Sequence, residues 1–184
     1  MTHVRQRERE EFSEEELRAL HNWLEAAYGD PPGSWLSTHW DDLGPGPHFL
    51  IEGPDGETLS HACVVWVPVT VGRVPLNAGY LEDVATRADV RGQGLGTAIT
   101  KAAQELIEAE ADIGLLSTGS QPFYERLGWV TWRGPPAVVE EDGSLTPTPE
   151  EDGNIMALIL PRTPNGVTID APIVRPRRDA REAW

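Results

Sequence analysis

The segment Arg91-Gly92-Gln93-Gly94-Leu95-Gly96 separates a run rich in apolar and β-branched residues, 77–86, from a run with helical spacing, 97–111. Three glycines in six residues let backbone N–H groups approach a ligand closely, and the start of the following helix adds positive potential. The segment therefore predicts an anion-binding turn between a strand and a helix. The alternative is a glycine-rich turn that binds nothing.

The spacing of these glycines argues against two common nucleotide sites. The turn lacks the Lys-Ser/Thr ending of a phosphate-binding P-loop, and it lacks the G-x-G-x-x-G spacing of a dinucleotide site. Nucleotide hydrolysis and hydride transfer are therefore disfavoured.

Helices and strands are predicted on both sides of the turn. Ser13 and Glu16 form a capping box, and the apolar residues that follow recur at helical spacing until Gly29 and Pro31. A weaker helical patch covers 35–40. Further strands are predicted over 48–52, 59–71, 113–117, 129–132 and 155–160, a short helix over 123–127, an acidic loop over 140–153 and an irregular tail over 161–184.

Length and charge restrict the kind of protein and partner. The 184 residues suit a single domain. Thirty acidic residues against fifteen basic ones give a net charge of −15, and the basic residues gather at the two ends of the chain. Such a body repels phosphate backbones, which disfavours nucleic acid and favours a cationic small molecule. The alternative is that the acidity only maintains solubility.

Cysteine and hydropathy indicate the compartment. A single cysteine, Cys63, cannot form an intrachain disulfide and suits a reducing cytoplasm. No apolar stretch is long enough to cross a membrane, and the charged first residues do not resemble a secretory signal. His21, His48 and His61 show no metal-ligand spacing. We therefore expect a cytoplasmic protein without membrane contact or a bound metal.

These features together resemble the GCN5-related N-acetyltransferases. The resemblance rests on Arg-x-x-Gly-x-Gly at 91–96 between strand and helix, a following strand, and Phe123-Tyr-Glu-Arg-Leu-Gly-Trp129, and it covers roughly residues 48–160. It implies acetyl-CoA as cosubstrate, with its pyrophosphate on the loop amides and its pantetheine and thioester carbonyl on the amides of 84–86. The cofactor-binding residues so implied are Val84, Ala85, Thr86, Arg91, Gly92, Gln93, Gly94, Leu95 and Gly96.

The resemblance also implies the architecture. We expect an α/β (α+β) fold with about seven strands in a mixed, mostly antiparallel sheet flanked by helices, and with the cofactor in a splay between central strands. Residues 1–163 are predicted to form the acetyltransferase domain, and 164–184 an arm that completes the substrate site.

A closer resemblance is to the aminoglycoside 2′-N-acetyltransferases, and it spans nearly the whole chain. It rests on YLEDVA at 80–85, Gly128-Trp129, WRGP at 132–135, TPEEDG at 148–153 and REAW at 181–184. It implies acidic side chains around the amino sugars and a C-terminal tryptophan whose free carboxylate contacts the drug. The expected substrate-binding residues are Asp30, Glu82, Asp83, Ser117, Glu150, Glu151, Glu182 and Trp184. We also expect a homodimer.

The chain departs from the pattern of those enzymes in several places. Glu150, Glu151 and Glu182 stand where aspartates are expected, and His39 stands where an acidic residue is expected. The segment between 117 and 124 is shorter and lacks the expected arginines. The register of the drug is therefore expected to differ.

The chemistry of acetyl transfer suggests a role for three residues. An amine that is protonated at pH 7 must lose a proton before it attacks a thioester, so a carboxylate is needed beside it. Glu82 is the predicted base; its alternative role is to anchor the substrate, and one group can do both. Tyr124 is predicted to give the leaving thiolate a proton or a hydrogen bond, and its alternative is a packing role. Asp83 is expected to contact substrate mainly through its backbone carbonyl.

The resemblance thus implies direct transfer of acetyl to the 2′-amino group of aminoglycosides in a ternary complex. Two alternatives remain open. One is an acetyltransferase for another amine, such as a peptide terminus or a cell-wall amino sugar. The other is a non-catalytic protein that binds acetyl-CoA or an aminoglycoside.

Overall fold

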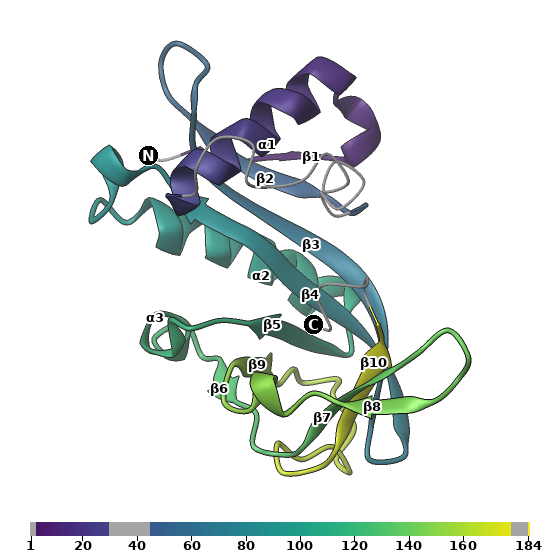
Figure 1. Ribbon diagram of the computed structural model, residues 1–184. Helices are drawn as coiled ribbons and strands as arrows, with labels where there is room; N and C mark the ends of the chain where they lie inside the picture. Colours follow the sequence, from purple (N-terminus) through teal and green to yellow (C-terminus); the bar gives the residue numbers. More distant parts are fainter. Residues whose placement is uncertain (1–2, 30–44, 178–183) are drawn as a thin grey trace. The chain divides into compact units, whose positions relative to one another are not determined.

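The computed structural model describes residues 3–29, 45–177 and 184. The chain divides into two compact units: the first comprises Met1–Val65 and Leu81–Glu105, and the second comprises Trp66–Tyr80 and Leu106–Trp184. Three elements run from one unit into the other. They are β3 (Thr58–Val71), β4 (Val74–Thr86) and α2 (Leu95–Glu110), all labelled in Figure 1. The predicted helical patch over 35–40 lies outside the described residues, as do Asp30 and Glu182.

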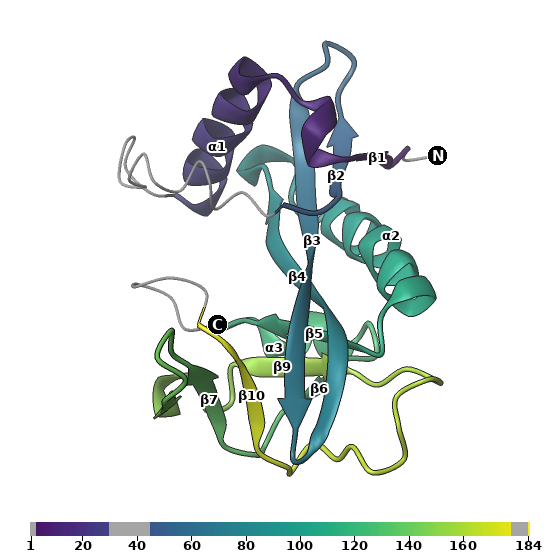
Figure 2. The ribbon, with the colours of Figure 1, turned by 90° about the vertical axis from the view of Figure 1, so that its right-hand side faces the viewer.

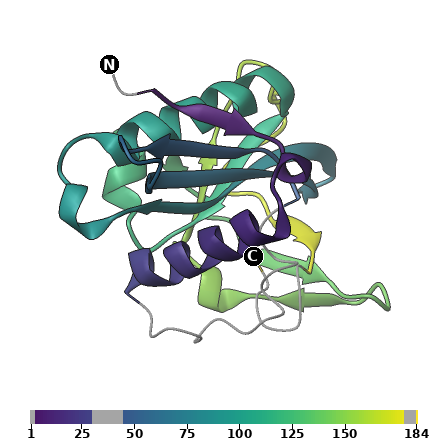
Figure 3. The same ribbon diagram turned by 90° about the horizontal axis from the view of Figure 1, so that it is seen from above.

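The first unit is an antiparallel sheet with a helix on each side. β1 (Arg5–Arg7) pairs with β2 (His48–Glu52), and β2 pairs with β3, both antiparallel. A 3-10 turn, η1 (Arg9–Glu11), leads from β1 to α1 (Glu14–Tyr28). Figure 3 shows α1 on one side of the β2 and β3 ribbons and α2 on the other. The strand β2 has the bounds that the sequence predicts.

The ends of α1 follow from local chemistry. The Glu16 backbone N–H donates to Ser13 Oγ at 3.2 Å, and the Ser13 N–H donates to the Glu16 carboxylate at 2.8 Å. This reciprocal pair satisfies two backbone donors that the helix itself leaves open. Gly29 ends the helix at φ 84, a left-handed conformation that costs glycine little. Both predicted ends of this helix are confirmed.

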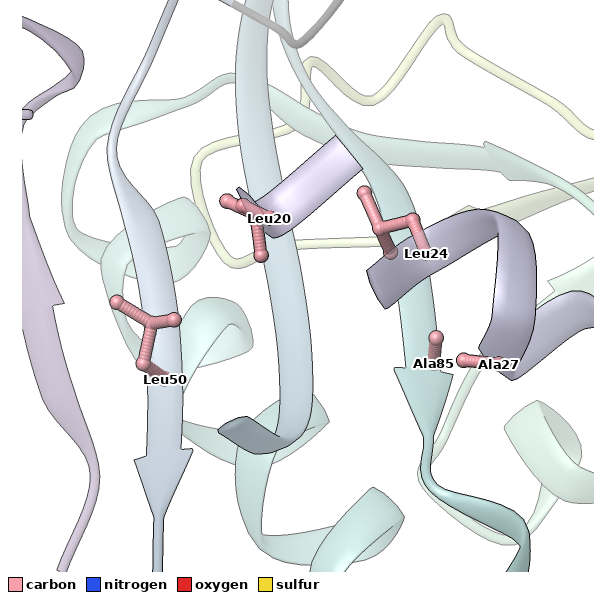
Figure 4. Packing of buried hydrophobic residues seen from close by; sticks show 5 residues of the cluster. All are labelled: Leu20, Leu24, Ala27, Leu50 and Ala85. Atoms are coloured by element: carbon pink, nitrogen blue, oxygen red, sulfur yellow. The ribbon is translucent and has the colours of Figure 1, made fainter. Parts of the chain in front are cut away.

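The apolar stripe of α1 packs on the sheet of the first unit. Leu20, Leu24 and Ala27 lie one helical turn apart and face Leu50 of β2 and Ala85 of β4, as Figure 4 shows. All five side chains are buried. A buried leucine contributes about 1.5–3 kcal/mol relative to an exposed one, so this stripe holds α1 beside the end of β4.

The second unit adds further strands to the same sheet, which has ten strands among the described residues. Apart from β1 and β2, the strand order is β6-β9-β5-β4-β3-β10-β7-β8. The added strands are β5 (Ile113–Ser117), β6 (Val130–Thr131), β7 (Pro136–Val139), β8 (Leu145–Pro147), β9 (Ile155–Leu158) and β10 (Ile173–Pro176). β4 pairs with β5 and β7 pairs with β10 in parallel, whereas the β5–β9, β6–β9, β3–β10 and β7–β8 pairs are antiparallel. The predicted α+β class with a mixed, mostly antiparallel sheet is confirmed.

α2 is the crossover that a parallel β4–β5 pair requires. Its approach depends on two glycines that lie opposite each other, Gly79 on β4 and Gly114 on β5. A Cβ at Gly79 would lie 2.8 Å from Ile107 Cγ1, and one at Gly114 would lie 2.9 Å from Leu158 Cβ. Both distances are too short for carbon atoms, so only glycine lets Ile107 seat against these strands.

Three predictions about the strands were wrong. The described residues form ten strands, more than the expected seven or so, because several are only two to four residues long. The loop expected over 140–153 contains β8 and a 3-10 turn, η4 (Pro149–Glu151), and the irregular tail contributes β10. Figure 2 shows β10 beside β7. Such short, Pro-containing strands are stabilised by their neighbours in the sheet and leave little periodicity to read.

Candidate active site

The end of β4 carries the predicted base and an unusual backbone. Glu82 is 8% exposed, and Asp83 has φ 52, the one left-handed residue other than glycine among the described residues. Two side chains of β3 hold the carbonyls that follow Glu82. Ser60 Oγ donates to the Ala85 carbonyl at 2.9 Å, and His61 Nδ1 lies 2.8 Å from the Asp83 carbonyl oxygen. Side chains of β3 thus hold the backbone at 83–85 in place.

The glycine-rich turn has the conformation that an anion cradle needs. Gly92 and Gly94 have φ 78 and 82, which other residues rarely adopt. A Cβ at either position would meet no protein atom within 4 Å. The Ala98 N–H donates to the Gly94 carbonyl at 3.0 Å as α2 begins. The first-turn amides of a helix have no partner within it, so this turn suits an anionic group.

Arg91 has a structural task that the sequence did not reveal. Its Nε–H donates to the Thr86 carbonyl at 3.0 Å, and its terminal N–H donates to the Ala27 carbonyl at 2.7 Å. One side chain therefore ties the turn to the end of β4 and to the last turn of α1. A cation at a helix C-terminus is also favoured by the helix dipole.

In the second unit, the structure brings two predicted substrate residues together. Ser117, at the end of β5, donates through Oγ to the Glu151 carboxylate at 2.8 Å. Gln121 Nε2, at the start of α3 (Gln121–Glu125), donates to the Thr118 and Gly153 carbonyls, both at 2.9 Å. The end of β5 is thereby linked to η4 and Gly153, which lie in the segment 149–153, here called the acidic turn. Glu150 is exposed.

Trp184 is buried in the second unit. Its side chain is 5% exposed, and its indole N–H donates to Thr148 Oγ1 at 2.9 Å. The Arg175 guanidinium carbon lies 5.9 Å from the Trp184 ring centroid and 4.8 Å from that of Tyr80. Thr148 directly precedes the acidic turn, so the tryptophan and Glu151 are connected through one short segment.

Sequence reasoning did not single out Thr148 or Arg175 as site residues. Arg175 lies two positions after buried Ile173 on β10, so the two side chains share a face of the sheet. Because β10 itself was not predicted, its four residues carry no sequence signal for this placement.

Tyr124 lies on α3 and is 8% exposed. Its ring makes edge-to-face contacts with Phe123 and Trp129, at centroid distances of 4.9 and 6.2 Å. Burial raises the pKa of Tyr124 to about 12. The phenol is therefore neutral at pH 7 and available as a hydrogen-bond donor.

Comparisons with known proteins define the class. The model of the acetyltransferase (GNAT) family matches residues 8–129. An aminoglycoside 2′-N-acetyltransferase from Mycolicibacterium fortuitum is 33% identical over 140 residues, which cover 75% of this chain and 70% of that protein. The chain therefore belongs to the GNAT acetyltransferase family, as the sequence motifs predict.

Solved structures show the same fold. The GNAT family N-acetyltransferase YhbS from Escherichia coli, in complex with CoA, matches with a TM-score of 0.65 at 13% identity over 95% of this chain and 89% of its own. A probable N-acyltransferase from Enterococcus faecalis V583 matches with a TM-score of 0.57 at 19% identity over 72% of this chain. The match covers 33% of that second protein, so this chain spans about a third of its length.

Two further observations concern the described residues only. None of their helices combines the length and apolar character needed to cross a bilayer. Within 3–29, 45–177 and 184, no three His, Cys, Asp or Glu side chains gather in a way that would hold a metal ion.

Proposed function

We propose that this protein transfers the acetyl group of acetyl-CoA to the 2′-amino group of aminoglycosides, directly and in a ternary complex. The observation that carries the proposal is the link from Ser117 to Glu151 and from Thr148 to Trp184 in the second unit. It joins three of the residues that the resemblance assigns to the substrate. The relative from Mycolicibacterium fortuitum supports the same activity.

In this proposal Glu82 prepares the amine. A protonated amine has no lone pair for attack, so Glu82 takes one proton from it before the new N–C bond forms. The buried position of Glu82 limits its contact with water, which strengthens its interaction with a cationic amine. Anchoring the substrate and accepting its proton are then successive roles of one carboxylate.

The backbone amides of β4 and the Tyr124 side chain are assigned to the thioester of acetyl-CoA. Bound acetyl-CoA supplies an acyl group that is already activated as a thioester. The amides of Val84–Thr86 are assigned to its carbonyl oxygen, where backbone N–H groups stabilise developing negative charge. Tyr124, with its pKa raised to about 12 by burial, is a weaker acid than a thiol at about 8.5. Tyr124 therefore stabilises the sulfur of the breaking C–S bond by donating a hydrogen bond, and the second proton that the nitrogen loses as the amide forms neutralises the departing thiolate.

Release of the coenzyme A thiol tests the proposal. Purified protein is mixed with acetyl-CoA and either aminoglycosides with a 2′-amino group or matched ones with a 2′-hydroxyl. Peptides and simple amines serve as further controls. Turnover only with the 2′-amino compounds, with one added acetyl group at that nitrogen by mass spectrometry and NMR, is the expected result.

Other outcomes of the same assay have distinct meanings. Turnover confined to peptides or other amines would replace the aminoglycoside with another acceptor. Binding of acetyl-CoA without turnover on any amine would favour a non-catalytic protein. The predicted homodimer is checked separately by light scattering of the same preparation.

A further inference from the structure

A buried line of side chains in the first unit ends at the unusual residue of β4. His61 Nδ1 lies 2.8 Å from the Asp83 carbonyl oxygen, and His61 Nε2 lies 2.9 Å from His48 Nδ1. Cys63 Sγ lies 4.0 Å from His48 Nε2. His48, His61 and Cys63 are each 0% exposed. Three side chains are thus aligned behind one peptide group, shielded from water.

The carbonyl at the end of this line fixes where each proton sits. A carbonyl oxygen only accepts hydrogen bonds, so His61 Nδ1 carries a proton and donates it to Asp83. Burial is the main cause that lowers the pKa of His61 to about 3, and nearby His48 contributes to the same lowering, so the ring is neutral at pH 7. Its Nε2 is therefore an acceptor, and His48 Nδ1–H donates to it.

The backbone conformation of Asp83 is one that a residue in a regular strand does not adopt. Asp83 has φ 52, although its neighbours Glu82 and Val84 belong to an extended strand. Aspartate tolerates this region better than most residues, but the conformation still persists only where its surroundings enforce it. The side chain that reaches the Asp83 peptide from β3 is that of His61.

We infer that His61 is a positioning residue for acetyl transfer: its Nδ1–H holds the Asp83 carbonyl, and His48 holds His61 in the required tautomer. The left-handed residue turns the backbone between the Glu82 carboxylate and the Val84–Thr86 amides, so it sets how both are presented. His61 itself touches no reactant. The inference rests on the proposed function for its kinetic readout, but its structural readouts are independent of any acceptor.

Imidazole 15N chemical shifts test the tautomers in the unmodified protein. We expect His61 and His48 each to carry a proton on Nδ1 and a lone pair on Nε2 at pH 7. Assignment follows from the loss of one set of signals in His61→Asn and of the other in His48→Gln. A proton on His61 Nε2 would overturn the inference, because Nδ1 would then have nothing to donate.

Three substitutions test the positioning role. In His61→Asn the amide nitrogen replaces Nδ1 and keeps the donor, whereas His61→Leu removes it. We expect His61→Leu to lower kcat roughly ten- to a hundredfold and to weaken acetyl-CoA binding severalfold in calorimetry. His61→Asn should stay within about threefold of the parent.

The double variant His61→Leu/Asp83→Gly separates positioning from simple packing. Glycine adopts φ 52 without a side chain's cost, so it should restore most of the lost acetyl-CoA affinity, a readout that does not depend on the predicted contact of Asp83 with the acceptor. A folded His61→Leu with parental kcat, or a double variant without recovery, would overturn the inference. If His61→Leu does not fold, His61→Gln against His61→Asn makes the same test, since glutamine places its amide at the Nε2 position.

Failure of this inference differs from failure of the proposed function. A parent protein that binds acetyl-CoA but acetylates no aminoglycoside would remove the proposed substrate. In that case the tautomers and the acetyl-CoA affinities of the same variants still decide the role of His61.

Discussion

The candidate cofactor residues of the first unit and the candidate substrate residues of the second unit are built from different parts of the chain. In the first unit they are backbone groups at 84–86 and 91–96, shaped by left-handed φ angles at Asp83, Gly92 and Gly94. The side chains of Ser60, His61 and Arg91 hold this backbone. In the second unit the candidate groups are side chains, Ser117 with Glu151 and Trp184 with Thr148. Binding by backbone groups is retained when nearby side chains change, provided that the backbone keeps its conformation. Binding by side chains is altered directly when one of those side chains is substituted.

This difference predicts that the candidate cofactor site withstands changes in sequence that would alter the candidate substrate site. The relatives with solved structures are 13–19% identical to this chain and still share its fold. At that identity most side chains differ, whereas backbone conformation is retained. Variants that alter the backbone at 84–86 and 91–96 should therefore affect acetyl-CoA, and variants of Ser117, Glu151 and Trp184 should affect the acceptor.

The largest expected effect concerns Glu82, the side chain beside the backbone site. Glu82→Gln should lower kcat/KM by about a hundredfold or more, the usual range for loss of a general base. The loss should be greatest at low pH, where fewer amines are already deprotonated, and should shrink as pH rises. Initial rates over a pH series measure it, with Glu110→Gln on the exposed end of α2 as the control. A parallel pH–rate profile for the variant would leave Glu82 only the anchoring role.

The backbone character of the cofactor site is tested with matched glycines. Gly94 and Gly143 have φ 82 and 83, and a Cβ at either meets no protein atom within 4 Å. Asp at either position therefore brings the same backbone strain, about 1–2 kcal/mol. Only Gly94→Asp should also weaken acetyl-CoA binding, roughly ten- to a hundredfold, by placing an anion against the pyrophosphate.

Calorimetry with acetyl-CoA on both glycine variants provides the comparison. Gly143→Asp should bind as the parent does, although it unfolds at lower temperature. Equal acetyl-CoA affinities for the two variants would mean that the turn before α2 does not hold the cofactor.

The buried histidine gives the first unit a pH-dependent stability. His61 has a pKa of about 3 when folded, with burial as the main cause, against an ordinary value of 6.5. The unfolded chain thus binds the extra proton first as pH falls. Stability is complete above about pH 6.5 and is lost at about 1.4 kcal/mol per pH unit from there toward pH 3. Between pH 7.5 and 5 the loss from this group is about 2 kcal/mol.

Urea unfolding at several pH values measures this loss. His61→Asn has no titrating ring and should show a slope smaller by one proton below pH 6.5. Parent and variant with equal slopes would show that His61 is not buried as a neutral ring.

The sequence predicted the first unit better than the second, for a physical reason. Glycines at 92 and 94 and the capping box at Ser13 act locally, so their conformations follow from neighbouring residues. The hydrogen bond from Trp184 to Thr148 spans 36 positions and depends on β10, whose four residues show no usable periodicity. Ser117 and Glu151 were predicted separately through the family resemblance, and only the fold pairs them.

The role of His61 was missed for the same reason. The sequence shows His48 and His61 without metal spacing and suggests nothing more. Their alignment requires the antiparallel register of β2 and β3, which places His48 opposite Cys63 and His61 opposite Leu50. Side chains two positions apart on one strand then share a face and form a line.

Variants of Trp184 test the candidate substrate site of the second unit, with an expected effect of intermediate size on the aminoglycoside KM. Trp184→Ala should raise the aminoglycoside KM about tenfold, because the buried indole is hydrogen-bonded to Thr148, next to the acidic turn. Trp184→Phe keeps a ring without the N–H donor and should fall between parent and Ala. Acetyl-CoA affinity should stay at its parental value in both. Loss of acetyl-CoA affinity in Trp184→Ala would mean that the tail is a general structural support.

The smallest expected effect belongs to Ser117, which touches the acidic turn by one hydrogen bond. Ser117→Ala removes the donor to Glu151 at the exposed end of β5, and water can take its place. The hydrogen bond contributes about 0.5–1.5 kcal/mol, so the aminoglycoside KM should rise about three- to tenfold while kcat stays near that of the parent.

Glu151→Gln sharpens this last test, since it keeps a hydrogen-bond acceptor for Ser117 and removes the charge. If the acidic turn attracts a polycationic acceptor, Glu151→Gln should raise KM more than Ser117→Ala does, and the excess should shrink as salt is added. Equal increases in KM for the two variants, unchanged by salt, would mean that Ser117 and Glu151 only hold the acidic turn against β5. The second unit would then have no side-chain substrate site at this pair.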